Sequence, residues 1–193
     1  MHAKKVFWVS ISLILSMGVC MSQEIVMNQD VTNVLLRLDG TTKILLKKSP
    51  DDALKISDLV FKGTDKNPVQ MILDGNTALI TQKSNANSFS VSYTLAIPDN
   101  KNIKITAGNL LLDGEVSATG LEVNSGNLSV SGKFEIEKNA IFTAGNASFA
   151  LVLGKCEGLS FRFGNVSGKI HVPRDCKYTK PPFWSALKIH EGY

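Results

Sequence analysis

The sequence contains little of the chemistry that enzymes use. It has three cysteines and three histidines in 193 residues, and none of them stands in a spacing typical of a metal site. His2 belongs to the leader described below, and the pattern places His171 on the outer face of a strand, away from any ligand or base. Nucleophile elbows, phosphate-binding loops and calcium-binding repeats are also absent. The sequence therefore names no reaction and predicts no cofactor and no metal.

Long apolar runs are also lacking, with one exception at the start of the chain. Residues 6–19 are mostly apolar and follow Lys4 and Lys5, and small residues occur at Cys20 and Ser22. A membrane-spanning helix needs about 20 apolar residues, so this run is better read as the core of a signal peptide. We predict that residues 1–22 are a signal peptide, and that the protein is exported to the periplasm, the cell surface or the outer membrane.

Cys20 leaves a second interpretation open. Bacterial lipoproteins are cut in front of a cysteine that is then acylated, and Cys20 lies where such a cysteine would stand. Met17, Gly18 and Val19 match the usual preceding residues poorly. We expect membrane contact only through the signal or through a lipid on Cys20.

Strong overall charge is missing too. The formal net charge is +4, and residues 1–22 carry two lysines and no acid, so +2 remains after cleavage. A nearly neutral chain argues against nucleic-acid binding. The positive charge gathers after Gly154, which suggests contact with an anionic envelope glycan or lipid headgroups. The candidate residues are Arg162, Lys169, Arg174, Lys177 and Lys180.

What the sequence does contain is a repeat. A Gly-Asn pair recurs four times, at Gly108, Gly126, Gly145 and Gly164, with spacings of 18, 19 and 19 residues. Apolar and polar residues alternate on both sides of each pair, which predicts two short strands per repeat with one face buried. We expect the Gly-Asn pairs to form corners in which φ is positive, because glycine and asparagine tolerate that conformation.

Stacked repeats of this kind predict an all-β fold. Equivalent apolar residues of successive repeats would lie on one another and bury a continuous core. This gives a parallel β-solenoid, or single-stranded β-helix, of about seven or eight rungs. Residues 23–176 are the expected domain, and 177–193 an apolar C-terminal cap or a free tail that presents Trp184. Near the N-terminus the pattern predicts two strands around Gly40, a turn or single helical turn at 49–59, and one more repeat at 69–81.

The stretch from Val91 to Leu110 carries a resemblance. It alternates, passes through Ile97-Pro98 and enters the first Gly-Asn repeat, and in this it resembles the bacterial putative-adhesin family. The similarity covers residues 25–173. It implies an exported β-solenoid without known catalysis, and it implies no functional residues.

Together these patterns predict a non-enzymatic envelope or surface protein, an adhesin or a scaffold. One alternative is a carbohydrate-active enzyme that acts on an acidic polysaccharide, with Glu122 and Glu135 as its carboxylates. Another is a lipid-anchored partner in envelope signalling. The partner is unknown: it is an anionic glycan or another protein, and a bare terminal rung would also permit edge-to-edge self-association.

Cys156 and Cys176 generate a testable prediction. They remain after signal cleavage and lie about one repeat apart, so stacking would bring them within bridging distance, and exported proteins favour disulfides. The alternative is a pair of free thiols. If the bridge forms, thiol titration of the denatured, unreduced protein will find no reactive group in the mature chain, whereas two reactive groups would refute it.

Overall fold

The computed structural model describes residues 24–64, 66–85, 88–179 and 185–192. The signal peptide expected at 1–22, the lipidation candidate Cys20, the basic residue Lys180 and the tail residue Trp184 lie outside this range. The cap expected at 177–193 is described only in part.

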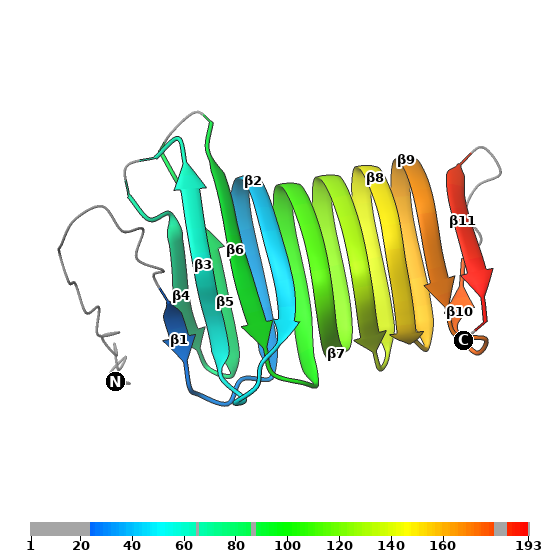
Figure 1. The fold of residues 1–193 in the computed structure, drawn as a ribbon, viewed down its shortest axis with the longest axis horizontal. Helices are drawn as coiled ribbons and strands as arrows, with labels where there is room; N and C mark the ends of the chain where they lie inside the picture. Colours follow the sequence, from blue (N-terminus) through cyan, green and yellow to red (C-terminus); the bar gives the residue numbers. More distant parts are fainter. Residues whose placement is uncertain (1–23, 65, 86–87, 180–184, 193) are drawn as a thin grey trace.

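The described residues form strands and no helix, so the predicted all-β class is confirmed (Figure 1). None of them belongs to a helix that could span a membrane. The strands are β1 (Ile25–Met27), β2 (Asn33–Lys48), β3 (Leu54–Lys62), β4 (Val69–Asp74), β5 (Thr77–Gln82), β6 (Ser90–Ile97), β7 (Lys101–Ile136), β8 (Asn139–Lys155), β9 (Gly158–Val172), β10 (Lys177–Tyr178) and β11 (Ala186–Glu191).

Strands β7, β8 and β9 wind into successive coils that lie side by side (Figure 1). Their pairing is parallel and in register, so Leu121 is the partner of Ala140, and Ala140 is the partner of Leu159. The sequence predicted this file of three residues. Strand β7 holds more than one coil, because the Glu137 and Lys138 amides that follow it donate back to residues 118 and 119 at 2.9 Å.

Each coil has two runs separated by its Gly-Asn pair. Leu121 and Val123 are buried before Gly126, and Leu128 and Val130 are buried after it. The buried positions thus change from odd to even numbers across the glycine, which requires a bend at that point. We call the residues before each pair the first run (121–125, 140–144 and 159–163) and those after it the second run (127–134, 146–153 and 165–172).

The core lies between the two runs of every coil. Phe134 and Phe142 are completely buried, and in the C-terminal coils Phe142 meets Phe149 edge to face at 5.3 Å between ring centroids. A fully buried side chain of this kind contributes about 1.5–3 kcal/mol, more than the 0.5–1.5 kcal/mol of a typical net hydrogen bond. The apolar file inside the coils is therefore the main source of stability.

The N-terminal third departs from the predicted stack of parallel rungs. Strand β2 lies directly beside β7 in parallel, although about 68 residues separate the paired segments. The intervening β3 pairs antiparallel with both β1 and β6, and β4 with β5, so the sheet is mixed. Only β4 and β5 form a hairpin with a short connection, which antiparallel pairing allows without a crossover. β1 and β3, and β3 and β6, are antiparallel neighbours with other strands between them in the sequence.

Three local predictions in this region are wrong. The segment expected as a turn or helical turn at 49–59 ends in strand β3, which begins at Leu54. The stretch 69–81 is an antiparallel hairpin with its turn at Gly75, and so it is not a further parallel repeat. Around Gly40 the chain is one strand with a register shift between Leu38 and Thr41, where two strands were expected.

At the other end, β10 and β11 pair in parallel with β9. Leu187 of β11 is buried and Ile189 packs against the core. This part of the tail continues the winding of the sheet.

The backbone at the four repeat glycines differs from the corner geometry expected from the sequence. None of them has a positive φ, and neither do their asparagine partners. A Cβ at Gly126 would instead lie 2.8 Å from the carbonyl oxygen of Gly108, and one at Gly164 would lie 2.7 Å from that of Gly145. Glycine is needed here because adjacent coils approach too closely for a side chain.

Positive φ occurs at a different set of glycines, which sequence reasoning did not single out. Two of them, Gly132 and Gly168, lie in the second runs, and Gly114 precedes Gly132 by one repeat. Their φ angles are between +107° and +115°. A Cβ at Gly132 would lie 1.9 Å from the Gly114 carbonyl oxygen. These positions combine a backbone conformation and a close approach that only glycine permits.

We expect Gly132→Ala to lower the free energy of unfolding by about 3 kcal/mol or more, from backbone strain and from the clash with the next coil. Gly75→Ala is the matched control, because Gly75 also has a positive φ (+62°) but has nothing within 4 Å of the added Cβ. Its cost should be about 1 kcal/mol. Urea unfolding followed by circular dichroism measures both, and equal losses would contradict the stacking argument.

Candidate functional site

A row of asparagine side chains crosses the coils at the start of the second runs. Asn127 donates to Asn109 at 2.7 Å, Asn146 to Asn127 at 2.8 Å, and Asn165 to Asn146 at 3.0 Å. Asn109 in turn reaches the Thr41 hydroxyl of β2 at 3.5 Å. The row exists because parallel in-register pairing puts each asparagine beside its counterpart. We call Asn109, Asn127, Asn146 and Asn165 the asparagine ladder.

All amides of the asparagine ladder point the same way. Each amide nitrogen donates toward the N-terminal coils, so each carbonyl oxygen faces the C-terminal end. Within the described part of the chain no hydrogen bond reaches the side-chain oxygen (Oδ1) of Asn165. Aligned amides polarise one another, which makes this last oxygen a good acceptor for a ligand.

A row of serines runs beside the asparagine ladder. Ser129, Ser148 and Ser167 follow their asparagines by two residues and so face the same side, and the Ser148 hydroxyl donates to that of Ser129 at 3.2 Å. The two rows line a shallow groove of about 380 Å³, the corner groove. Its lining residues are Asn109, Leu110, Leu111, Asn127, Leu128, Ser129, Asn146, Ala147, Ser148, Asn165, Val166 and Ser167.

The corner groove contains no titratable side chain. Its amides and hydroxyls both donate and accept hydrogen bonds, and Leu111, 44% exposed, adds an apolar surface at one end. Its lining therefore offers hydrogen-bonding groups to a partner. The described residues also include no cluster of three or more side chains that could ligate a metal ion.

A second groove, of about 420 Å³, opens over the first runs. It contains an ion pair in which the Lys104 amine lies 2.9 Å from the Glu122 carboxylate, and Asn124 also donates to Glu122 at 2.9 Å. The hydrogen bonds from Lys104 and from Asn124 lower the pKa of Glu122 below its ordinary value. Ile141, 40% exposed, supplies apolar surface.

The two carboxylates proposed for the enzyme alternative are held separately. Glu122 is paired with Lys104, and Glu135 lies 3.8 Å from Lys133, two residues earlier in its own strand. The sequence analysis missed both lysine partners. A general acid needs a pKa raised toward neutrality, whereas that of Glu122 is shifted downward.

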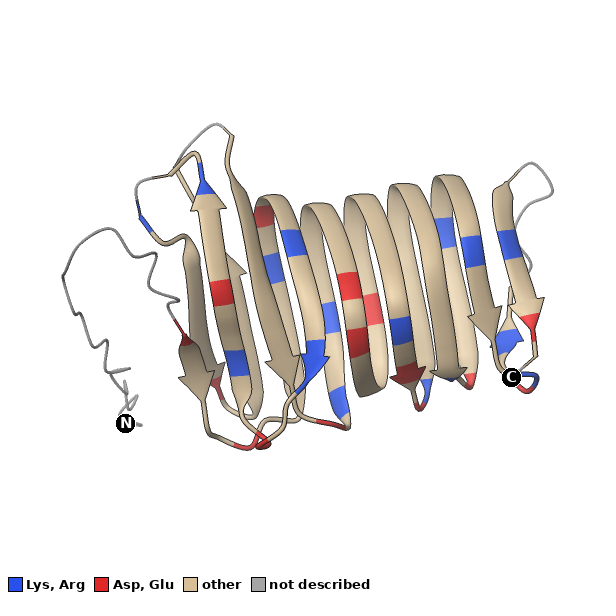
Figure 2. Ribbon diagram, in the orientation of Figure 1, with Lys and Arg blue, Asp and Glu red and all other residues tan. Residues whose placement is uncertain are grey.

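The basic residues expected to contact an anionic polymer lie at the C-terminal end, where Figure 2 shows blue segments on β9 and β11. They do not form one patch. Arg162 lies in the first run of β9 and Lys169 in the second, on either side of the bend at Gly164, while Arg174 lies in the loop after β9 and Lys177 begins β10. Lys169 is the in-register partner of Lys188 in β11.

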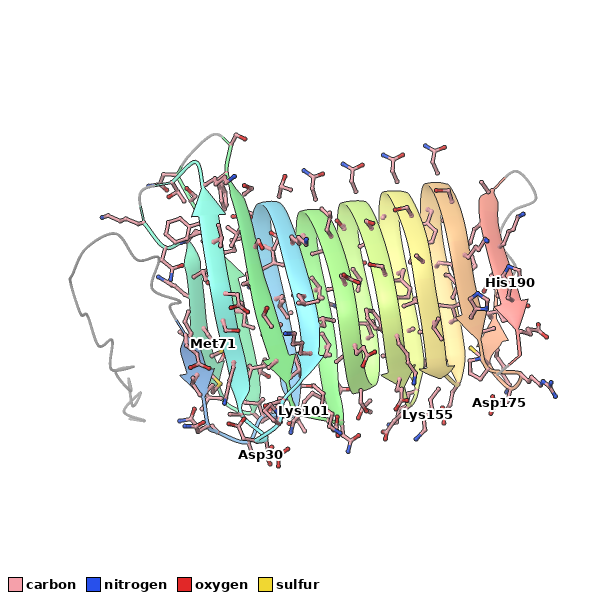
Figure 3. The ribbon with its side chains drawn as sticks, in the orientation of Figure 1. Asp30, Met71, Lys101, Lys155, Asp175 and His190 are labelled. Carbon is pink, nitrogen blue, oxygen red and sulfur yellow. The ribbon has the colours of Figure 1, made fainter. Side chains whose placement is uncertain are left out.

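Next to these lysines lies a pair of histidines that the sequence analysis did not connect. His171 of β9 and His190 of β11 are register partners, and their rings stack with centroids 5.0 Å apart at an interplanar angle of 20°. Figure 3 labels His190 at this end of the sheet. The two residues are 19 positions apart in the sequence, which is the repeat period. That spacing was the signal that could have revealed the pair.

Cys156 and Cys176 are both buried and both free in the structure. Burial raises the pKa of Cys156 and raises that of Cys176 to about 12, and the two thiols lie within hydrogen-bonding reach of each other. A thiol held protonated in this way is a poor nucleophile, so neither cysteine has the environment of a catalytic residue. Their oxidation to a disulfide remains a prediction.

No protein-family model and no curated protein matches the chain. Among solved structures it is similar to a putative adhesin from Parabacteroides merdae, with 13% identity, a TM-score of 0.33, and coverage of 91% of this chain and 98% of that one. A putative adhesin from Parabacteroides distasonis gives 14% identity, a TM-score of 0.35, and coverage of 88% and 93%. A putative adhesin from Bacteroides fragilis gives 14% identity, a TM-score of 0.29, and coverage of 88% of this chain and 94% of that one. Likeness this low does not assign the chain to a family.

The asparagine ladder generates a prediction about stability. Asn146→Ala removes two hydrogen bonds and Asn165→Ala removes one, so we expect losses of about 1 kcal/mol and about half of that. Denaturant unfolding of the two variants measures the difference. A larger loss for Asn165→Ala would contradict an additive ladder.

Proposed function

We propose that the protein is an exported, non-enzymatic component of the cell envelope or cell surface that serves as an adhesin or a scaffold. In this proposal residues 1–22 direct export, residues 23–176 form a β-solenoid of about seven or eight coils that is irregular at its N-terminal end, and residues 177–193 cap the other end. The protein acts in the periplasm, at the outer membrane or at the cell surface.

The corner groove is the observation that carries this proposal. It crosses four successive coils and repeats the same asparagine and serine on three of them. Coils spaced by about 4.8 Å present these groups at regular intervals, which suits an extended partner that itself repeats. A polysaccharide, rich in hydroxyl groups that donate and accept, has the matching chemistry.

The rigidity of the sheet favours such binding. The groove residues belong to hydrogen-bonded strands, so little conformational entropy is lost when a partner is held. Each hydrogen bond to an exposed amide or hydroxyl contributes little, and affinity arises from repetition along the polymer. This is the behaviour expected of an adhesive or scaffolding surface.

The alternatives have less support. Polysaccharide cleavage would need two cooperating carboxylates, and Glu122 and Glu135 are each engaged by a lysine. The lipid-anchored signalling partner depends on Cys20, outside the described residues.

The test is polysaccharide binding by the mature chain, measured by affinity electrophoresis in gels that contain neutral and acidic bacterial polysaccharides. Ser148→Tyr fills the middle of the corner groove and should weaken retention at least about tenfold. Ser160→Tyr is the matched control, since Ser160 is an exposed serine of the first run of β9 outside both grooves. Equal effects of the two variants, or release of reducing sugar ends by the wild type, would refute the proposal.

A further inference from the structure

Two lysines and two histidines lie close together on strands β9 and β11 at the C-terminal end of the sheet. Lys169 and His171 alternate along β9, and Lys188 and His190 occupy the partner positions of β11. Residues two apart in a strand face the same side, so both lysines and both histidines share the outer face. We call these four residues the terminal quartet.

The surroundings of the terminal quartet contribute no opposing charge from the adjacent strand. The register partners of Lys169 and His171 on β8 are Ala150 and Val152. One coil further, Lys133 of β7 is paired with Glu135. Figure 2 shows blue segments on β9 and β11 and a red one where β11 ends at Glu191.

Two acidic residues lie close to the terminal quartet in sequence. Glu191 follows His190 and accepts a hydrogen bond from the Tyr178 hydroxyl of β10 at 2.5 Å. Asp175 lies in the loop after β9, between Arg174 and Cys176 in the sequence.

The terminal quartet is continuous with the corner groove. Ser167, which lines the groove, precedes Lys169 by two residues on the same strand and the same face. A polymer that follows the serine row across the coils next meets Ala186 of β11, the register partner of Ser167. Turning there along β9, it would reach Lys169 and then His171. This continuity favours a polysaccharide over a lipid headgroup, because no exposed large apolar side chain lies on β9 or β11 to enter a membrane.

We propose that Lys169, Lys188, His171 and His190 form a binding site for the sulfate or carboxylate groups of an anionic polysaccharide, and that the site binds more tightly as pH falls. The inference rests on the proposed function for the choice of polymer. The sign follows from proton linkage: protonating both rings puts four positive charges side by side, and a bound anion offsets their repulsion. Binding therefore takes up protons, and acid strengthens it.

The experiment uses dextran sulfate as the probe and unsulfated dextran as its neutral counterpart, with binding to the mature chain measured by calorimetry. Histidine changes charge between about pH 5 and 8, so measurements at about pH 7.5 and about pH 5.5 bracket the change. We expect wild-type affinity for dextran sulfate to rise about tenfold or more on acidification, and to fall steeply with added salt.

Variants separate the roles. His171→Gln with His190→Gln should abolish the pH response and leave the affinity at its neutral-pH level. Lys169→Gln with Lys188→Gln should weaken binding at both pH values. Lys43→Gln with Lys47→Gln is the matched control, since it removes two exposed lysines from β2, which β7 and β8 separate from β9, and it should keep the wild-type pH response.

The inference is overturned if the double-histidine variant keeps the wild-type pH response, or if the two double-lysine variants lose affinity equally. It is also overturned if anionic phosphatidylglycerol vesicles bind with this pH response while dextran sulfate does not. Failure of the proposed function looks different. Ser148→Tyr would then leave retention of neutral polysaccharides unchanged, while the pH response to dextran sulfate could still be present.

Discussion

In-register parallel pairing between successive coils is the constraint on which this structure depends. Each backbone strand has the next coil as its hydrogen-bonding partner, so residues one repeat apart must lie side by side. Inside the coils this places Leu121, Ala140 and Leu159 in one apolar file, and outside it aligns the asparagine ladder. The same rule excludes Cβ atoms at Gly126, where the neighbouring carbonyl oxygen is already in contact distance.

Much of the regular part of the fold could be predicted because its period is written in the sequence. Alternation identified the strands, and the recurrence at 18 or 19 residues identified which ones lie together. The conformation of the glycines could not be predicted, because a glycine required by close approach looks the same in sequence as one required by positive φ. Gly126 and Gly132 illustrate the two cases.

The irregular end was harder to predict for a different reason. Pairing of β2 with β7 joins segments separated by a long insertion, and no local pattern marks such a contact. Of the functional surface, the individual basic residues were visible in the sequence, but their grouping was not. His171 and His190 become one feature only when the repeat period is applied to polar residues as well as to apolar ones.

The place of β2 has a consequence for how the chain acquires its structure. On one side, residues 33–38 of β2 pair with β5 and residues 41–48 pair with β6, and on the other side both segments pair with β7. The strand therefore acquires all of its partners only when the chain up to residue 114 is available. A solenoid can fold by adding coils in order from one end, but here the N-terminal strand β2 can complete its pairing only after the middle of the chain is present. Closing so large a loop is entropically costly and slow, so we infer that ordering begins among the local repeats of β7 and β8 and that the N-terminal strands join afterwards.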